Sequence, residues 1–519
     1  MISRSQPSSK PRSDLLLIDY FELTARERPD HPFVHYVDEE PAGDAVLSYA
    51  EADLLAGACV QEMRKAGVGK GAVVALLMPN SPLWLVWYLA CQKLGAICSG
   101  LNPQLSDNEL LQSLRVLDTR HLVCAGEQAA RGRTAALSMP ELRLLPDFPE
   151  VDVRISVERD PALSRADGLS AIFTSGTTGA VPKAALQVHG AVVDAIGNYI
   201  RHLDVQAHDR IMLVTPLTHS SALNWGVTLA VMSGATLVLA KKFSASRFWA
   251  QADRARPTVL WTMNTILFIL LTQPPTDVEE RASRQLRFIF GAGSAPRWQQ
   301  LTRRWHCAVL DGYGMTETFG TLTDADCNGL SSAHACIGRP VQGIDMRIVD
   351  PETGAECASG VIGEIVTRFG QGFARYINNP AAFADAVRDG WFHTGDMAFR
   401  DELGRYFFVD RLKNIIRRGG ENISSLEIEE CLAQHPEVLE VIALPVPHDI
   451  LGEAVMVALV PRDAGRIFSL DEIRAFCGPR LAPFKWPEHV RTVSAEDVPR
   501  TGSGKVRKTL LARSLSDAQ

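Results

Sequence analysis

Lysine is scarce in this 519-residue sequence, where only 11 of the 53 basic residues are Lys and the rest are Arg. Basic excess is absent as well, because 60 acidic residues leave a net charge of −7. This balance gives no sign of a nucleic acid or an anionic membrane as partner. The ten Cys include no CxxC pair, which favours buried thiols in a reducing cytoplasm over disulfides or a zinc site. We therefore expect a cytoplasmic protein.

A targeting segment and a membrane span are also missing from the pattern. Residues 1–13 are polar and lack the apolar core of a signal peptide, so we expect a disordered tail. The most apolar stretch, residues 220–240, is broken by Ser233-Gly234 into a helical part and a β-branched strand. This break predicts a buried α/β unit and no membrane span.

Short apolar runs alternate with amphipathic segments through most of the chain, which predicts parallel α/β architecture with more than one domain. The clearest expected strand–helix–strand units are residues 73–78, 82–94 and 96–101, and residues 210–215, 223–232 and 235–239. Residues 125–166 are rich in Arg, Pro and Glu, and we expect an irregular surface connection there.

A domain boundary is predicted near Asp410. Residues 404–409 are typical of a strand after a turn, and a basic stretch with two glycines follows. Ser424 and Glu427 have the spacing of a capping box that opens a helix. We expect a large domain over residues 14–409 and a small α+β domain over residues 410–519.

One loop has the composition of a phosphate-binding segment. It follows the apolar run 169–173, and its glycines, hydroxyls and terminal Lys are groups that approach and neutralise phosphate oxygens. It is not a Walker A loop, because Gly-Lys-Ser/Thr is missing and Pro182 precedes the Lys. Its binding candidates are Thr174, Ser175, Gly176, Thr177, Thr178, Gly179 and Lys183.

Five further patterns follow in order along the chain. Gly291-Ala292-Gly293-Ser294 comes after the apolar run 286–290, but Pro296 stands where a dinucleotide fingerprint needs Gly. The others are Pro216-Leu217-Thr218-His219, Asp311-Gly312-Tyr313-Gly314-Met315-Thr316-Glu317, Gly390 to Asp396 with Asp410-Arg411-Leu412-Lys413, and Pro499 to Lys505.

Together these motifs resemble the adenylate-forming superfamily of acyl-CoA synthetases, peptide-synthetase adenylation domains and luciferases, over residues 47–505. The resemblance implies α/β subdomains with a β-barrel-like subdomain in the large domain, and a mobile C-terminal domain. It also implies an acyl-CoA synthetase that uses ATP, Mg²⁺ and coenzyme A to convert a carboxylic acid, through its acyl-adenylate, into a thioester.

The same resemblance implies a role for each motif residue. Lys505, His219, Thr178 and Glu317 are the expected catalytic residues, with Glu317 as the magnesium ligand and Lys413 as the hinge. Tyr313 is expected on the adenine, Thr316 at the α-phosphate, and Asp396 with Arg411 at the ribose. The remaining nucleotide or thiol contacts are Gly291, Ala292, Gly293, Ser294, Asp311, Gly312, Gly314, Met315, Gly419 and Gly420.

The expected acid pocket contains His219, Ser220, Ser221, Trp225, Gly291 and Gly314. The segment after His219 lacks the Asp with which peptide-synthetase domains bind an α-ammonium group, so the resemblance disfavours a free α-amino acid. Gly314 replaces the Trp of acetyl-CoA synthetases, which favours an acid larger than acetate. Only 79 positions separate Glu317 from Asp396, which leaves no room for the insertion of fatty acyl-AMP ligases and favours CoA. An acyl carrier protein as acceptor, a luciferase-like oxygenase and a homodimer stay open.

Overall fold

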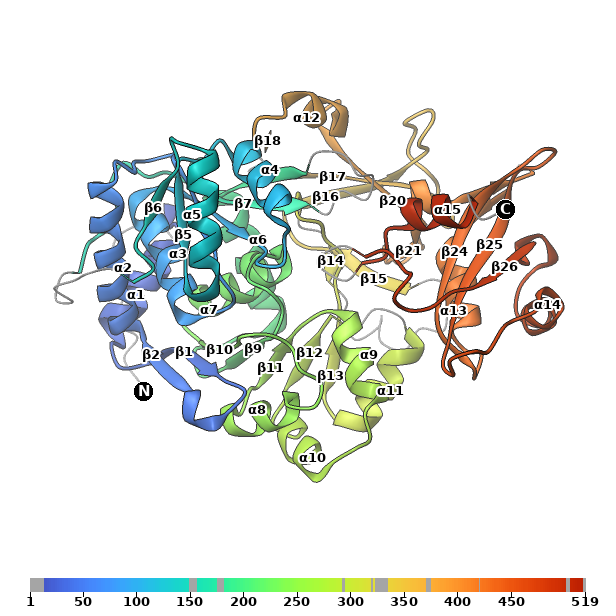
Figure 1. Cartoon of the computed structure of the whole chain (residues 1–519), viewed down its shortest axis with the longest axis horizontal. Helices are drawn as coiled ribbons and strands as arrows, with labels where there is room; N and C mark the ends of the chain where they lie inside the picture. The colour runs from blue at the N-terminus through green and yellow to red at the C-terminus, as the bar shows by residue number, and fades with distance from the viewer. Residues whose placement is uncertain are drawn as a thin grey trace.

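The computed structural model describes residues 14–148, 156–174, 182–291, 295–318, 321–322, 335–369, 375–419, 421–500 and 505–516. The expected tail, residues 1–13, lies outside this range. Four sheets organise the described chain, and Figure 1 shows three of them on one side and the C-terminal one on the other.

The first sheet contains β1 (Pro32–Val37), β2 (Ala45–Ser48), β9 (Arg210–Leu213), β10 (Thr236–Ala240), β11 (Val259–Trp261), β12 (Phe288–Phe290) and β13 (Ala308–Leu310). Its order is β13-β12-β11-β9-β10-β1-β2, and every pair except β1–β2 is parallel. Because parallel strands end at one edge, the segments after β9, β12 and β13 meet there. These segments are the predicted motifs that begin near Pro216, Gly291 and Asp311.

The second sheet contains β3 (Val73–Leu77), β4 (Ile97–Leu101), β5 (His121–Cys124), β6 (Arg143–Leu145), β7 (Gly168–Thr174), β8 (Lys183–Val188) and β18 (Arg375–Tyr376). Its order is β18-β8-β7-β4-β3-β5-β6. The pairs β7–β8 and β8–β18 are antiparallel, so Thr174 lies opposite Lys183 and Ala185 opposite Tyr376. The predicted phosphate loop therefore joins the ends of a hairpin.

Helices fill the space between these two sheets and cover their outer faces. They are α1 (Leu17–Glu27), α2 (Tyr49–Lys65), α3 (Pro82–Leu94), α4 (Asp107–Leu117), α5 (Ala129–Ser138), α6 (His189–Leu203), α7 (Thr228–Ser233), α8 (Phe248–Ala255), α9 (Asn264–Thr272), α10 (Asp277–Ser283) and α11 (Ala295–Trp305). The main core joins side chains of α1, α2, α3, α6 and α7 to both sheets.

Helix α3 illustrates how the sequence sets its ends. The Ser81 hydroxyl accepts a hydrogen bond from the Trp84 N–H, Pro82 occupies the first turn, and Gly95 ends the helix at φ +72°. Trp84 and Trp87 between these caps are fully buried. The bounds of this helix match the prediction from the sequence.

The irregular connection predicted for residues 125–166 is wrong in part. The segment contains α5 and β6, and Ala135 of α5 packs into the core beside β5. Ala and Arg are both good helix formers, and the prolines of this segment all lie after α5, so the chain is helical there.

The third sheet is antiparallel and stands where the barrel-like subdomain was expected. It contains β14 (Thr321–Leu322), β15 (Ala335–Pro340), β16 (Ile344–Val349), β17 (Gly363–Phe369), β19 (Val387–Arg388), β20 (Trp391–Arg400) and β21 (Tyr406–Arg411), and α12 (Pro380–Ala386) lies beside it. The order is β14-β15-β21-β20-β17-β16, with β19 on β20. Asp396 of β20 faces Arg411 of β21 across the ladder.

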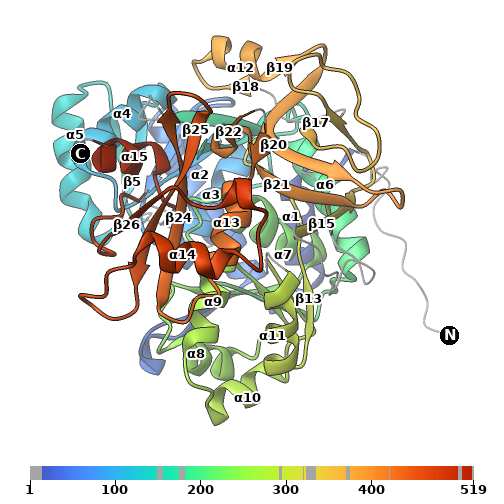
Figure 2. The ribbon, with the colours of Figure 1, turned by 90° about the vertical axis from the view of Figure 1, so that its right-hand side faces the viewer.

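The C-terminal elements form a small α+β unit with its own core. They are β22 (Ile416–Arg418), β23 (Glu421–Ile423), α13 (Ser425–Leu432), β24 (Val438–His448), β25 (Gly452–Pro461), α14 (Leu470–Cys477), β26 (His489–Thr492) and α15 (Lys508–Ser516). The sheet order is β23-β22-β25-β24, with β26 on β25. Figure 2 looks onto this unit, and α13 contacts the end of β21.

Within the described residues, no helix has the length and apolarity needed to cross a bilayer. The stretch 220–240 divides into a π-helix (Ser221–Val227), α7 and β10, as the Ser233-Gly234 break predicted.

Candidate active site

The end of the phosphate loop meets the expected metal ligand through Tyr376. The Lys183 ammonium lies 5.2 Å from the centroid of the Tyr376 ring, and the Tyr376 hydroxyl donates to Glu317 Oε1 at 2.7 Å. The pairing of β18 with β8 holds these groups together. Residues 175–181, including Ser175, Gly176, Thr177, Thr178 and Gly179, lie outside the described range.

Glu317 is a buried carboxylate, 5% exposed. Burial raises its pKa, while the Tyr376 hydroxyl and the charges of Arg411 and Lys183 oppose that shift. A buried carboxylate beside a phosphate loop is a donor that suits a hard divalent cation, because the cation offsets the cost of burying the charge. The residues present therefore fit a magnesium ion.

Asp396 is held by two side chains of its own site. The Tyr313 hydroxyl donates to Asp396 Oδ2 at 2.8 Å, and Arg411 Nε lies 3.2 Å from Oδ1. Burial raises the Asp396 pKa, against the effect of Arg411 and Tyr313. Apart from this ion pair, Oδ1 accepts no hydrogen bond from the described residues. A buried carboxylate oxygen with this free capacity fits the hydroxyls of a ribose.

Lys505 reaches the same place from the C-terminal unit. Desolvation and the positive charge of Arg411 lower the Lys505 pKa, and the charge of Asp396 opposes them. Burial, with a smaller effect of the Lys505 charge, lowers the pKa values of His219 and Lys413, and Arg411 also lowers that of Lys413. The predicted catalytic Lys, hinge Lys and ribose residues are thus close enough to act on one another.

His219 lies after β9 with a defined tautomer. The Ser221 N–H donates to Nδ1 at 3.1 Å, which leaves the proton of the neutral ring on Nε2. Burial, with the charge of Lys505, lowers the His219 pKa to about 4. His219 is therefore neutral at pH 7 and presents an N–H donor.

A cluster of aromatic rings begins at Ser221, close to this His, where the acid pocket is expected. The Trp261 indole N–H donates to Ser221 Oγ at 3.2 Å, and Phe290 stacks on Trp261 at 4.0 Å between ring centroids. Trp225 lies 6.4 Å from Trp261 and 6.2 Å from Tyr199. Four segments far apart in the sequence therefore supply one largely buried aromatic cluster.

Trp225 also fills the space beside Gly314. A Cβ placed on Gly314 would lie 2.7 Å from two carbons of the Trp225 ring. Trp225 projects from the π-helix, a local irregularity that is common at functional sites. Glycine at position 314 therefore does not by itself leave an open cavity.

The other predicted contacts surround this centre. Gly291 has φ +110°, and a Cβ there would overlap the carbonyl oxygen of Thr262, so only glycine fits. Thr316 Oγ1 lies 3.4 Å from Ser220 Oγ. Asp311 accepts from the Gly312 N–H, and the Met315 N–H donates to the Thr318 carbonyl. Ala292, Gly293 and Ser294 lie outside the described residues.

Gly419 stands apart from this cluster. It has φ +57° between β22 and β23, and its N–H donates to the Leu451 carbonyl. None of the contacts found in the described range joins it to the residues around Asp396. Gly420 is outside that range.

Two residues of the site were missed by the sequence reasoning. Tyr376 bonds Glu317, and the Gln187 side-chain amide donates to the Thr316 carbonyl. Tyr376 stands shortly before the Asn379-Pro380 helix start, which is a weak signal. Gln187 has none, because its role depends on where β8 lies in the sheet.

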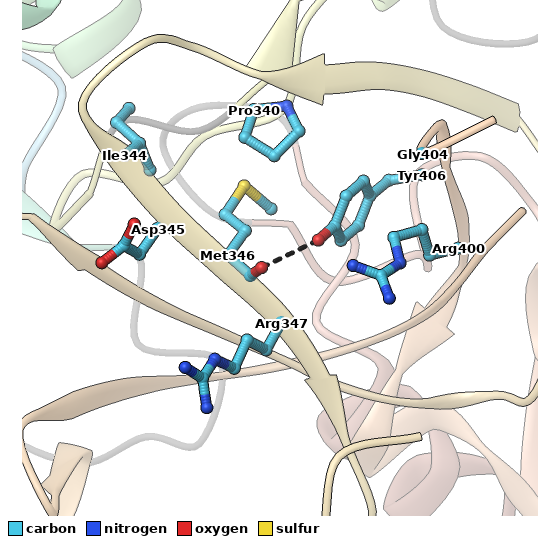
Figure 3. A pocket seen from close by; sticks show the side chains of 8 residues that line it. All are labelled: Pro340, Ile344, Asp345, Met346, Arg347, Arg400, Gly404 and Tyr406. Carbon is cyan, nitrogen blue, oxygen red and sulfur yellow. Dashed lines mark hydrogen bonds between the residues drawn. The ribbon is translucent and has the colours of Figure 1, made fainter. Parts of the chain in front are cut away.

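Two other features of the described chain lie apart from these motifs. A shallow pocket of about 320 Å³ between β16 and β21 is lined by Asp345, Arg347, Arg400 and Tyr406, whose hydroxyl donates to the Met346 carbonyl (Figure 3). His435, Glu437 and Glu472 form a cluster with metal-binding residue types. Arg466 pairs with both of these carboxylates, which accounts for the cluster as an ion-pair network.

The structure thus consists of a large α/β domain and a small C-terminal one, and the residues predicted to bind the nucleotide come from both. A family model described as AMP-binding enzyme matches residues 21–377, and one described as AMP-binding enzyme C-terminal domain matches residues 427–505.

Two related enzymes align with this chain over most of their length. Medium/long-chain-fatty-acid–CoA ligase FadD17 of Mycobacterium tuberculosis is 33% identical, over 85% of this chain and 86% of its own. Feruloyl-CoA synthase of an Amycolatopsis species is 32% identical, over 90% and 93%. The chain therefore belongs to the AMP-binding enzyme family and, with these CoA ligases, to its acyl-CoA synthetases.

A solved structure supports the fold. ATP-bound MatB from Rhodopseudomonas palustris aligns with a TM-score of 0.84 at 24% identity, over 96% of this chain and 99% of that one.

Proposed function

We propose that this enzyme activates a carboxylic acid with ATP as an acyl-adenylate and transfers the acyl group to coenzyme A, releasing AMP and pyrophosphate. The observation that carries the proposal is the geometry around Asp396, where the Tyr313 hydroxyl donates to Oδ2 at 2.8 Å and Arg411 Nε lies 3.2 Å from Oδ1, so that Oδ1 can still accept from a ribose. The charge of Lys505, from the C-terminal unit, acts on Asp396, Arg411 and His219. A cation delivered by one domain to the nucleotide site of another is suited to a transient negative charge.

In the first step, a carboxylate oxygen of the acid attacks the α-phosphorus, and the bond from that phosphorus to pyrophosphate breaks. Lys505 neutralises charge on the phosphorus and on the leaving group, and Lys183 with the hydroxyls of residues 174–178 binds the other phosphates. His219 Nε2–H donates to the acid and fixes its orientation. Asp396 and Arg411 hold the ribose, and Tyr313 contacts the adenine.

A magnesium ion held by Glu317 would supply charge neutralisation on the phosphate oxygens. Tyr376 orients the Glu317 carboxylate for that task by its hydrogen bond at 2.7 Å. The Thr316 hydroxyl, close to Ser220, is available to the α-phosphate.

In the second step, the C-terminal domain turns about Lys413 and withdraws Lys505. A thiolate then attacks the acyl carbonyl, a thioester bond forms, and AMP leaves. Gly419 and Gly420 would let the pantetheine arm pass close to the backbone. This account keeps the proposed boundary near residue 410, but it leaves all of β21, Asp410 and Arg411 included, in a sheet of the large domain and lets the turning part begin at Lys413. The separate core of the C-terminal elements supports this proposal.

The aromatic cluster supports an acid with an apolar acyl group. FadD17 is named for medium- and long-chain fatty acids and the synthase for ferulate, and Trp225, the partly exposed ring of the cluster, would pack on either kind of chain or ring with Trp261 and Phe290 behind it. We propose that Trp225 sets the far end of the acid pocket. A cytoplasmic location fits the absence of CxxC pairs and the free thiols among the described cysteines.

The test is pyrophosphate release across linear C2 to C16 acids and ferulate, with and without CoA. We expect acid-dependent release, and a thioester only when CoA is present. Adenylate without a CoA thioester would indicate a carrier-protein acceptor. The absence of pyrophosphate with every acid would refute the proposed function.

A further inference from the structure

The last two residues of β21 point to opposite sides of the strand and serve different domains. Arg411 reaches Asp396 at the nucleotide site, whereas Asp410 faces the C-terminal unit and is 3% exposed. Asp410 Oδ2 accepts from the Ser425 hydroxyl at 2.8 Å, the Leu426 N–H at 3.0 Å and the Ser424 hydroxyl at 3.3 Å. A buried carboxylate is stable only when donors surround it in this way. The donors to Oδ2 all belong to the start of α13, whereas Oδ1 accepts from the Arg411 N–H at 2.6 Å and from the Asn414 side-chain amide at 3.3 Å.

Ser425 links Asp410 to Lys508 through hydrogen bonds of its hydroxyl group. The Lys508 ammonium donates to Ser425 Oγ at 2.7 Å, and the Ser425 hydroxyl donates to Asp410. Lys508 also pairs with Glu429 at 2.7 Å, one turn further along α13. A continuous chain therefore runs from Asp410 through the buried Ser425 to Lys508.

Lys508 opens α15 only three residues after Lys505. The segment between them is fixed to its own surroundings. Val506 forms a β-bridge with Arg500, and the Arg507 N–H donates to the Pro499 carbonyl at 2.7 Å. Only these two residues separate Lys505 from Lys508, and both are held by backbone contacts. The position of Lys508 therefore limits where the Lys505 ammonium can lie.

We propose that Lys508 is a positioning residue for Lys505, and that the Asp410–Ser425–Lys508 chain holds the two domains in the arrangement that forms the adenylate. This inference rests on the proposed function. Asp410 precedes the hinge Lys413, whereas Ser425 and Lys508 follow it, so a turn about Lys413 separates them. The chain is therefore intact in the adenylating arrangement and broken when the thioester forms.

Ser425→Ala tests this without changing a charge. It removes the link between Asp410 and Lys508 but leaves the Leu426 N–H on Asp410 and Glu429 on Lys508. We expect acid-dependent pyrophosphate release to fall about tenfold, measured with whichever of the C2 to C16 acids or ferulate the unmodified enzyme uses fastest. Thioester formation from the synthetic adenylate of that acid and CoA should stay within about twofold.

Lys508→Met should slow pyrophosphate release more than Ser425→Ala does and should also spare thioester formation from the preformed adenylate. Lys508→Arg should restore adenylation, because a guanidinium can reach both Ser425 and Glu429. Lys508→Met leaves the Glu429 carboxylate without its ion-pair partner. The double variant Lys508→Met/Glu429→Gln removes that charge, and it should still slow adenylation while it spares thioester formation.

Lys485→Met is the matched control. Lys485 pairs at 2.7 Å with Glu427, which lies on α13 as Glu429 does. The side chains of Lys485 and Glu427 are 22% and 17% exposed, and those of Lys508 and Glu429 are 21% and 18% exposed. It does not contact the Asp410–Ser425 link, so both half-reactions should stay within about twofold.

Three results would overturn the inference while the unmodified enzyme releases pyrophosphate normally. They are an unchanged adenylation rate in Ser425→Ala, an equal loss of both half-reactions in either single variant, and Lys508→Arg as slow as Lys508→Met. Failure of the unmodified enzyme to release pyrophosphate would instead refute the proposed function and, with it, this inference.

Discussion

The contact between Trp225 and Gly314 predicts that Gly314→Ala lowers activity and that Trp225→Ala cancels this loss. The new Cβ would lie 2.7 Å from two ring carbons, and the ring has little freedom to turn because Tyr199 and Trp261 flank it at 6.2 and 6.4 Å. Overpacking of this kind costs about 1–3 kcal/mol. Because the displaced ring would move into the proposed acid pocket, we expect a cost of this size in binding the acid, which is about a 5- to 150-fold loss of kcat/KM for the acid.

The assay is pyrophosphate release by the unmodified enzyme, both single variants and the double variant. In the Trp225→Ala background, Gly314→Ala should change kcat/KM by less than about twofold, which gives a coupling energy of the size above. Trp225→Ala should also favour longer acids, by up to about fourfold for each added methylene that packs in the vacated space.

Gly69→Ala is the control for this cycle, because a Cβ there meets nothing within 4 Å. It should be neutral in both backgrounds. An equal loss from Gly314→Ala with and without the indole ring would refute the reasoning, because it would mean that Trp225 does not limit the space at position 314.

The remaining predictions concern catalysis and stability. Lys505→Ala should reduce pyrophosphate release at least about 100-fold and spare thioester formation from preformed adenylate; equal loss of both steps would contradict domain rotation. Lys93, 1% exposed, pairs with Glu22 at 2.6 Å and Asp53 at 2.8 Å, so Lys93→Met should cost about 3–5 kcal/mol in urea unfolding. Lys65→Met, which breaks an exposed pair with Glu62, should cost less than about 1 kcal/mol, and similar costs for the two would refute the burial argument. Burial lowers the His189 pKa from 6.5 to about 4. As pH falls between these two values, the unfolded chain binds a proton that the folded chain does not, so the free energy of unfolding decreases. His189→Leu should remove about 2 kcal/mol of the loss in unfolding free energy between pH 7 and pH 5, and an unchanged acid loss would show that His189 is not the group responsible.

Much of the fold could be predicted from local pattern. Helix α3 follows from Ser81, Pro82 and Gly95, whose effects act within one turn. The strands before the motifs at Thr174, Pro216 and Gly291 were recognisable as apolar runs, and the parallel arrangement placed their ends at common edges. The error at α5 came from taking Arg and nearby Pro as signs of irregular structure, although Arg and Ala both favour a helix and no Pro lies in α5.

The sequence by itself determined the order of the motifs and the kind of chemistry they carry, because glycines, hydroxyls, carboxylates and lysines at fixed short spacings act locally. Only the tertiary structure decided which distant residues complete them. Tyr376 reaches Glu317 because β18 pairs with β8, and Trp225 closes on Gly314 because a π-helix projects its ring there. Asp410 and Lys508 are joined through Ser425 by the packing of two domains. Such contacts depend on register and docking over tens to hundreds of residues, and no local spacing encodes them.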